Sequence, residues 1–242
     1  MLLVKDSPRK NISARPDSQS FSEIISLLYK AITTSKSLVF TILAGTLYHV
    51  VLGAAQFEVI WAVADKGFNP NTFGQINGWI FVVFGVLGSL FGGIASDWAL
   101  KNYGLPRTWF LLILTIILMP LAFTRYLDTD NILFWVGICS SAFSLGCFYG
   151  PIFAVIQELV PSSIKGTVVA FNLLCLNMLG IASGSILFGI IADYAVAQGY
   201  ENPYTNLLVG FSVLFLIFGP ILYFLAGRYY ESDRKKLQKE FS

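Results

Sequence analysis

The chain has 242 residues, of which 55% are apolar and only 12% are charged, and its mean hydropathy is +0.68. Because soluble proteins carry about 25% charged residues, this composition excludes an ordinary soluble domain and indicates a multi-pass membrane protein. The formal net charge of +2 gives no support to a nucleic-acid partner. The cysteines Cys139, Cys147 and Cys175 fall inside apolar segments without a ligand spacing, so we predict no disulfide, metal site or cofactor.

Residues 1–36 are predicted to form a cytoplasmic linker that contains one amphipathic helix. Residues 5–19 are polar and include two prolines. Ser20 and Glu23 then have the spacing of a capping box, and apolar residues recur at helical intervals over 21–32. We expect this helix to lie along the membrane surface. The apolar start of the chain is too short for a signal peptide, so we expect the chain to begin inside a longer protein.

Residues 37–230 are predicted to form a bundle of membrane-spanning helices, and residues 231–242 a basic cytoplasmic tail. A spanning helix needs about 20 mostly apolar residues. Six stretches approach or exceed this length: 37–64, 73–98, 108–123, 132–160, 168–194 and 207–227. The loops between them are short and rich in turn-forming residues, so successive helices are expected to run antiparallel.

The distribution of basic residues predicts which side of the membrane each loop faces. Of the 16 Lys and Arg residues, only Lys66 and Arg125 fall in the first, third and fifth loops. The others lie in the amino-terminal segment, the second and fourth loops and the tail. Under the positive-inside rule, both termini are predicted to be cytoplasmic, in the plasma membrane or, in a bacterium, the inner membrane.

The second and fifth predicted helices end in the same pattern, Gly-x-x-x-Asp, at Asp97 and Asp193. An odd number of crossings separates them, so the two acids should lie at opposite ends of the bundle. The third and sixth helices also match, because each is almost wholly apolar and carries one proline in its second half, Pro120 and Pro220. We therefore predict an all-α membrane protein whose six helices form an inverted 3+3 repeat, an arrangement that builds secondary transporters.

Glycines and serines that recur at four-residue intervals mark the second and fifth helices as close-packing elements. Small residues at this spacing let helix backbones approach closely in a membrane. The predicted packing glycines are Gly85, Gly88, Gly180, Gly184 and Gly189. For any one of them, ordinary packing inside a single bundle is the simpler explanation. Two glycine stripes on the second helix indicate, in addition, a partner outside this bundle.

The end of the second helix resembles a loop motif of the major facilitator superfamily of transporters. Gly92, Gly93, Asp97 and Lys101 are similar to the motif that follows the eighth of that family's twelve helices, and the loop here ends in Arg107. The family often places a base directly after the acid, whereas this chain has tryptophan there. The sequence therefore does not predict which salt bridges the motif forms. The resemblance covers nearly the whole chain as helices seven to twelve, the C-terminal half of the fold.

A narrower resemblance concerns the fourth and fifth helices. Gly150, Pro151 and Gln157, followed by Asn177 and Gly180, are similar to the pattern of the Spinster-like branch of the family. That branch has members that move lysolipids or sphingoid lipids. The resemblance implies a lipid-like solute as one of the substrate classes to be considered.

Polar residues inside the first and fourth helices are the candidate substrate contacts. His49 is the only histidine and lies near mid-depth, with Gln56 and Glu58 further along the same helix. An ionisable group at this depth is costly and is a functional hypothesis by default, although a neutral histidine can simply bond a neighbouring helix. The family resemblance implies that the first and fourth helices line the central cavity, which adds Ser144 and Tyr149 to the candidates.

The leading hypothesis is the C-terminal half of a secondary active transporter, a symporter or antiporter that works by alternating access. His49 and Glu58 suggest proton coupling, and the expected substrate is a small organic or lipid-like solute. Its partners would be membrane lipid and the missing N-terminal six-helix half, or a second copy. The alternative is a self-assembling six-helix protein or scaffold without transport activity of its own. We predict no enzyme, because no nucleophile, base and orienting group share one depth.

Overall fold

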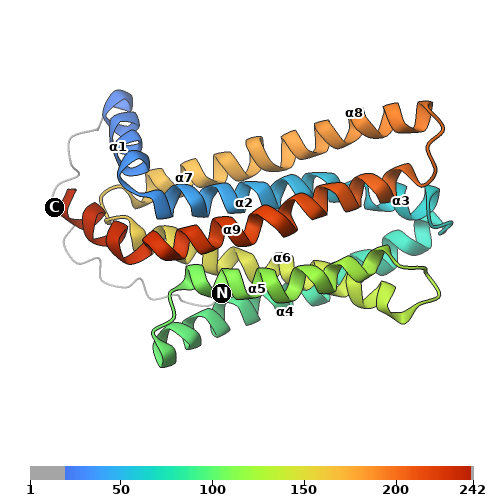
Figure 1. Ribbon diagram of the computed structural model, residues 1–242, viewed down its shortest axis with the longest axis horizontal. Coiled ribbons are helices and arrows are strands. Elements are labelled where there is room, and N and C mark those ends of the chain that lie inside the picture. Colours follow the sequence, from blue (N-terminus) through green and yellow to red (C-terminus); the bar gives the residue numbers. More distant parts are fainter. Residues whose placement is uncertain (1–19, 241–242) are drawn as a thin grey trace, which may run out of the picture.

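The structure is a computed structural model that describes residues 20–240. Over these residues every regular element is helical, and six helices are long and apolar enough to cross a membrane (Figure 1). The short helix α1 (Phe21–Thr34) begins with the predicted capping box, in which Ser20 and Glu23 each accept a hydrogen bond from the other's backbone N–H. It crosses the direction of the bundle (Figure 1).

The bundle follows α1 in chain order. Its elements are α2 (Lys36–Ala55), α3 (Glu58–Ala64), α4 (Pro70–Tyr103), α5 (Arg107–Phe123) with the short 3-10 turn η1 (Thr124–Tyr126), α6 (Ile132–Leu159), α7 (Lys165–Leu174), the π-helical segment η2 (Cys175–Ala182), α8 (Ser183–Ala197) and α9 (Pro203–Glu240). We refer to the end that carries α1 as the α1 end and to the opposite end as the α3 end.

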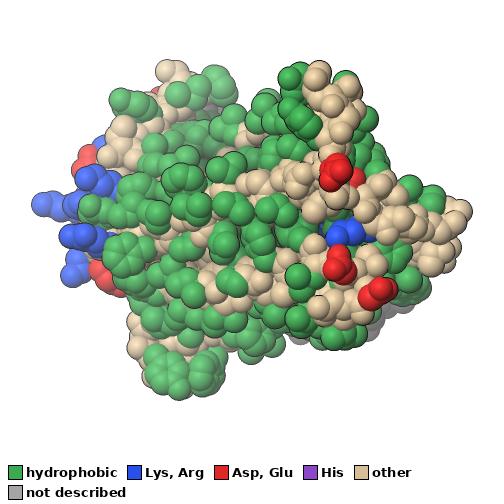
Figure 2. Space-filling model, turned by 45° about the vertical axis from the view of Figure 1, so that its right-hand side comes forward, with side chains coloured by type: hydrophobic (Ala, Val, Ile, Leu, Met, Phe, Trp, Pro, Cys, Tyr) green, Lys and Arg blue, Asp and Glu red, His purple; other side chains and the backbone are tan. Residues whose placement is uncertain are grey.

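The inverted repeat is confirmed by the course of the chain. In Figure 1, α4 ends at the α1 end, whereas α8 ends at the α3 end. Asp97 and Asp193, close to the ends of these two helices, therefore lie on opposite sides of the bundle. The face shown in Figure 2 is largely apolar along its sides, and most of the Lys and Arg side chains visible on it gather at one end.

Packing inside the bundle repeats in the same inverted sense. The first helix of each repeat packs on the second and third helices of the other: α2 lies against η2, α8 and α9, and α6 lies against α4 and α5. The two third helices, α5 and α9, pack on each other. This reciprocal packing is what a twofold relation between the two sets of three helices requires.

Glycines make the closest contacts of both repeats. A Cβ on Gly88 would overlap the carbonyl oxygen of Phe143 in α6, and a Cβ on Gly184 would overlap that of Val50 in α2. Each of these glycines therefore lets the second helix of one repeat touch the backbone of the first helix of the other repeat.

The first helices contribute a matching pair of glycines, Gly53 and Gly146. A Cβ on Gly53 would meet the backbone of Ile181 and Ser185, and one on Gly146 would meet the backbone of Gly85 and Ser89. The first and fourth helices thus correspond as well, which their sequences alone do not reveal.

The first predicted span is interrupted where the sequence predicts one helix over 37–64. Helix α2 ends at Ala55, and α3 starts at Glu58 after a turn in which Phe57 bonds the carbonyl of Ala54. Trp61 in α3 is fully buried and donates its indole N–H to Thr205 at 2.8 Å. Because of this break, the short helix α3 closes that end of the bundle, and the Glu58 side chain points towards the inside of the bundle.

The last helix is longer than predicted, because α9 continues through the segment from residue 231 to Glu240. Asp233 in this extension is fully buried and accepts a hydrogen bond from the backbone N–H of Ser37 at 2.9 Å. Its carboxylate thereby satisfies a free donor at the start of α2, where a negative charge is favourable. The part of the predicted tail that the structure describes is helical and docked on the bundle.

Candidate functional site

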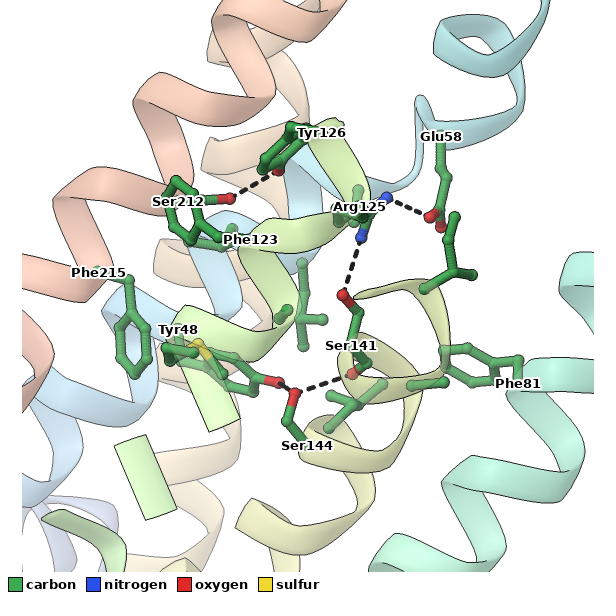
Figure 3. A pocket seen from close by; sticks show the side chains of 18 of the residues that line it. Tyr48, Glu58, Phe81, Phe123, Arg125, Tyr126, Ser141, Ser144, Ser212 and Phe215 are labelled. Carbon is green, nitrogen blue, oxygen red and sulfur yellow. Dashed lines mark hydrogen bonds and ion pairs between the residues drawn. The ribbon is translucent and has the colours of Figure 1, made fainter. Parts of the chain in front are cut away.

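A cavity of about 90 Å³ lies among α2, α4, α5, α6 and α9, with Glu58 of α3 at its edge (Figure 3). Both first helices of the repeats contribute to it. Most of its lining is apolar, and the aromatic side chains among the lining residues are Tyr48, Phe81, Phe123, Tyr126 and Phe215.

A buried ion pair forms the charged part of this lining. Arg125 in η1 donates to the Glu58 carboxylate and to the hydroxyl of Ser141 at 3.3 Å (Figure 3). The second Glu58 oxygen accepts from the amide of Asn77 at 3.2 Å. The side chains of Arg125 and Glu58 are only 9% and 16% exposed. The pair therefore joins α3, α4, η1 and α6 at one point.

Hydroxyl groups supply the remaining polar contacts. The hydroxyls of Tyr48 and Ser144 lie 3.3 Å apart, and Ser144 also donates to the carbonyl of Ser141 at 2.9 Å. Further towards the α3 end, Tyr126 and Ser212 share a hydrogen bond of 2.9 Å. Polar groups from α2, α6, η1 and α9 thus surround an otherwise apolar space (Figure 3).

The predicted residue His49 lies beside this cavity rather than in its wall. It is buried in α2, with Nδ1 2.7 Å from the Gly45 carbonyl and Nε2 3.1 Å from the hydroxyl of Tyr149 in α6. A carbonyl can only accept, so Nδ1 carries a proton, and a neutral ring would then accept from Tyr149 at Nε2. The pair connects the first helices of the two repeats.

The predicted cavity residues are therefore divided by the structure. Glu58 and Ser144 line the cavity, and His49 and Tyr149 form their own contact next to it. Gln56 lies in the turn between α2 and α3, is exposed, and is not part of the lining.

Residues of the predicted loop motif meet at the α1 end. Arg107, at the start of α5, donates to Asp97 at 2.6 Å and to Glu158 at the end of α6. Glu158 also accepts from the hydroxyl of Tyr230 at 2.8 Å. Arg107 is 11% exposed, whereas Asp97 is 70% exposed, so the buried part of the network is the contact of Arg107 with Glu158.

The other motif residues take less part in this network. Lys101 forms no ion pair with any residue over 20–240. Gly92 packs directly on the backbone of Cys147, whereas a Cβ on Gly93 would meet nothing within 4 Å. Gly92 thus acts as a packing glycine, and the neighbouring face at Gly93 is open.

The charged cavity residue that the sequence does not single out is Arg125, which it presents only as a basic residue of an outer loop; the polar lining residues Tyr48, Asn77, Ser141, Tyr126 and Ser212 are likewise not predicted. One signal was present. Glu58 and Arg125 are an acid and a base that both border apolar spans on the same predicted side. Buried charges are paired, so the two could have been expected to meet.

These features define a multi-pass membrane transporter built on an inverted repeat, with a polar-lined cavity between its first helices. The family model of the Major Facilitator Superfamily matches residues 1–185, and the chain belongs to this family. It is therefore a secondary transport protein and not an enzyme. Comparison with the curated proteins gave no match.

Proposed function

We propose that the chain is the C-terminal half of a proton-coupled transporter that moves a small organic or lipid-like solute by alternating access. The proposal places both termini in the cytoplasm and the protein in the plasma membrane, or the inner membrane of a bacterium. The other half would be an N-terminal six-helix bundle, or a second copy of this one. The lipid-like solute follows the resemblance to the Spinster-like branch.

The observation that carries this proposal is the position of the cavity. It lies between α2 and α6, which are the first helices of the two inverted repeats. Transporters built on such repeats hold their solute near mid-depth where the repeats meet. A polar-lined cavity at this junction is what such a site requires.

Proton coupling is supported by the two acid–base groups beside the cavity. Glu58 is almost buried and is held by Arg125 and Asn77. His49 is buried and held by Tyr149. Ionisable groups inside a membrane bundle are expensive, and in pumps and transporters they form proton relays. We propose both groups as candidates for the coupled proton, and His49 in addition links the two repeats.

The test is solute flux and proton flux in proteoliposomes that contain the full-length protein, with a pH-sensitive dye inside. A panel of neutral organic solutes and short-chain lipids is added, and wild type is compared with Glu58→Gln and His49→Ala. We expect Glu58→Gln to abolish solute-driven proton movement and His49→Ala to reduce solute flux by about tenfold or more, as for a polar group at a working intramembrane site.

The matched control is Asn177→Ala, because the Asn177 amide bonds the carbonyl of Leu173 in its own helix at 2.8 Å. This variant should transport like wild type. A wild-type protein that moves no solute of the panel would contradict the proposal, as would unchanged proton movement in Glu58→Gln.

The open face of α4 supports the presence of a second bundle. A Cβ added at Gly93 would meet nothing within 4 Å, and one added at Gly85 would meet only the carbonyl oxygen of Ala142, at 3.9 Å. The large side chains on this side of α4, including Val86 and Leu90, are exposed. A helix of the other half, or of a second copy, could approach this face closely. Cross-linking through a cysteine at Gly93 would identify which of the two it is.

A further inference from the structure

The charges in the cavity lining balance each other. Among the residues that line it, the charged ones are Glu58 and Arg125, one of each sign. The two are joined directly, and both are almost buried. The lining therefore presents no net charge to a molecule that enters.

Glu58 and Arg125 each already contact more than one partner. Arg125 donates to Glu58 and Ser141, and its guanidinium lies 5.2 Å from the ring of Trp61 and 5.6 Å from that of Tyr126. Glu58 also accepts from Asn77. A charged ligand would have to replace one of these partners and leave the other charge unpaired in a buried place, which is strongly unfavourable.

The rest of the lining favours rings and single hydrogen bonds. Phe81, Phe123 and Phe215 offer aromatic surfaces, and Met119 offers an adaptable apolar contact. The hydroxyls of Ser144 and Ser212 face the same space (Figure 3). The volume of about 90 Å³ leaves room for a small molecule or part of a larger one.

We propose that the cavity binds a molecule, or segment of a molecule, that carries no formal charge and contains a ring and one hydroxyl group, and that it rejects singly charged analogues. The ring packs on the phenylalanines, and the ligand hydroxyl donates to a serine oxygen. A zwitterion is rejected too, because it would have to separate Glu58 from Arg125. This inference rests on the proposed function, since it takes the cavity for the solute site.

The experiment compares three probes of nearly equal shape, benzyl alcohol, benzoate and benzylammonium, with phenylalanine as the zwitterion. Binding to the purified full chain in nanodiscs is measured by titration calorimetry at neutral pH. Wild type should bind benzyl alcohol about tenfold more tightly than either ion, as expected where a buried charge would go unpaired. Tighter binding of benzoate, benzylammonium or phenylalanine would overturn the proposal.

Charge variants of the pair make the test independent of absolute affinity. Glu58→Gln leaves the arginine uncompensated, so this variant should prefer benzoate. Arg125→Gln should prefer benzylammonium for the opposite reason. The double variant is again neutral and should return to benzyl alcohol, which also shows that the protein still folds. Preferences that do not follow the charge of the lining would overturn the proposal.

A cavity-filling variant separates binding in the cavity from partition into lipid. Ala122→Leu places three more carbons in the lining and should remove saturable binding. Ala197→Leu is the control, because Ala197 is exposed at the end of α8. Unchanged binding by Ala122→Leu would place the probe elsewhere and overturn the proposal. The binding assay applies no gradient, so its result does not depend on the result of the flux assay. The flux result in turn does not depend on the binding result.

Discussion

Replacing Gly88 by alanine tests whether the two repeats are held together by direct backbone contact. Gly88 in α4 faces Phe143 in α6, and an added Cβ would overlap the Phe143 carbonyl oxygen. The backbone of α6 cannot move aside as a flexible side chain could. The helices must therefore separate, and overpacking of this kind costs about 1–3 kcal/mol.

The matched control is Gly93→Ala on the same helix, five residues further on. An added Cβ there meets nothing within 4 Å. Alanine is favoured over glycine inside a helix by up to about 1 kcal/mol, so this variant should be neutral or slightly more stable. The two substitutions have the same chemistry and differ only in what surrounds the new methyl group.

The assay is thermal unfolding of the purified protein in detergent, followed by circular dichroism. We expect Gly88→Ala to lower Tm by about 3–10 °C relative to Gly93→Ala, on the scale of a few degrees per kcal/mol for a chain of this size. Gly184→Ala should behave like Gly88→Ala, because Gly184 meets the Val50 carbonyl in the same way. Equal Tm values for Gly88→Ala and Gly93→Ala would refute the reasoning.

Three further substitutions test other contacts. Arg107→Gln should lower the unfolding free energy by about 2–4 kcal/mol because it leaves Glu158 unpaired. The double variant with Glu158→Gln should recover part of this loss. If the effects of the two single variants simply add, the two side chains do not form a direct pair. Asp233→Ala should cost about 1–2 kcal/mol, measured by thermal unfolding, since it removes the acceptor for the Ser37 N–H; an unchanged Tm would mean that the extension of α9 does not stabilise α2. Trp61→Phe removes the hydrogen bond to Thr205 and should cost about 1 kcal/mol or more in the same assay, whereas a more stable variant would contradict this.

The spans and their directions could be predicted from the sequence because they depend on long-range averages. Apolar length decides whether a segment crosses the membrane, and antiparallel order then places Asp97 and Asp193 at opposite ends. Local irregularities within the helices could not be predicted from such averages. The turn after Ala55 and the π-helical segment η2 both occur within apolar stretches, where hydropathy does not change.

The candidate site was predictable in its parts but not in its pairing. His49, Tyr149, Glu58 and Ser144 could be named because polar residues inside apolar helices stand out. Arg125 and Glu58 are 67 positions apart, and the only signal for their contact is that both charges border apolar spans on the same predicted side. Sequence spacing within one helix gives no information about such a contact between helices.

The length of α9 has a mechanical consequence. Its 38 residues extend about 57 Å at 1.5 Å per residue, while the apolar core of a bilayer is about 30 Å thick. Much of the helix therefore stands outside the lipid, where Asp233 ties it to the start of α2 and Glu240 pairs with Lys30 of α1. A tilt of the bundle would carry this docked extension and α1 along with it, so a fluorophore attached at Glu231, which is exposed, would report the tilt from outside the lipid.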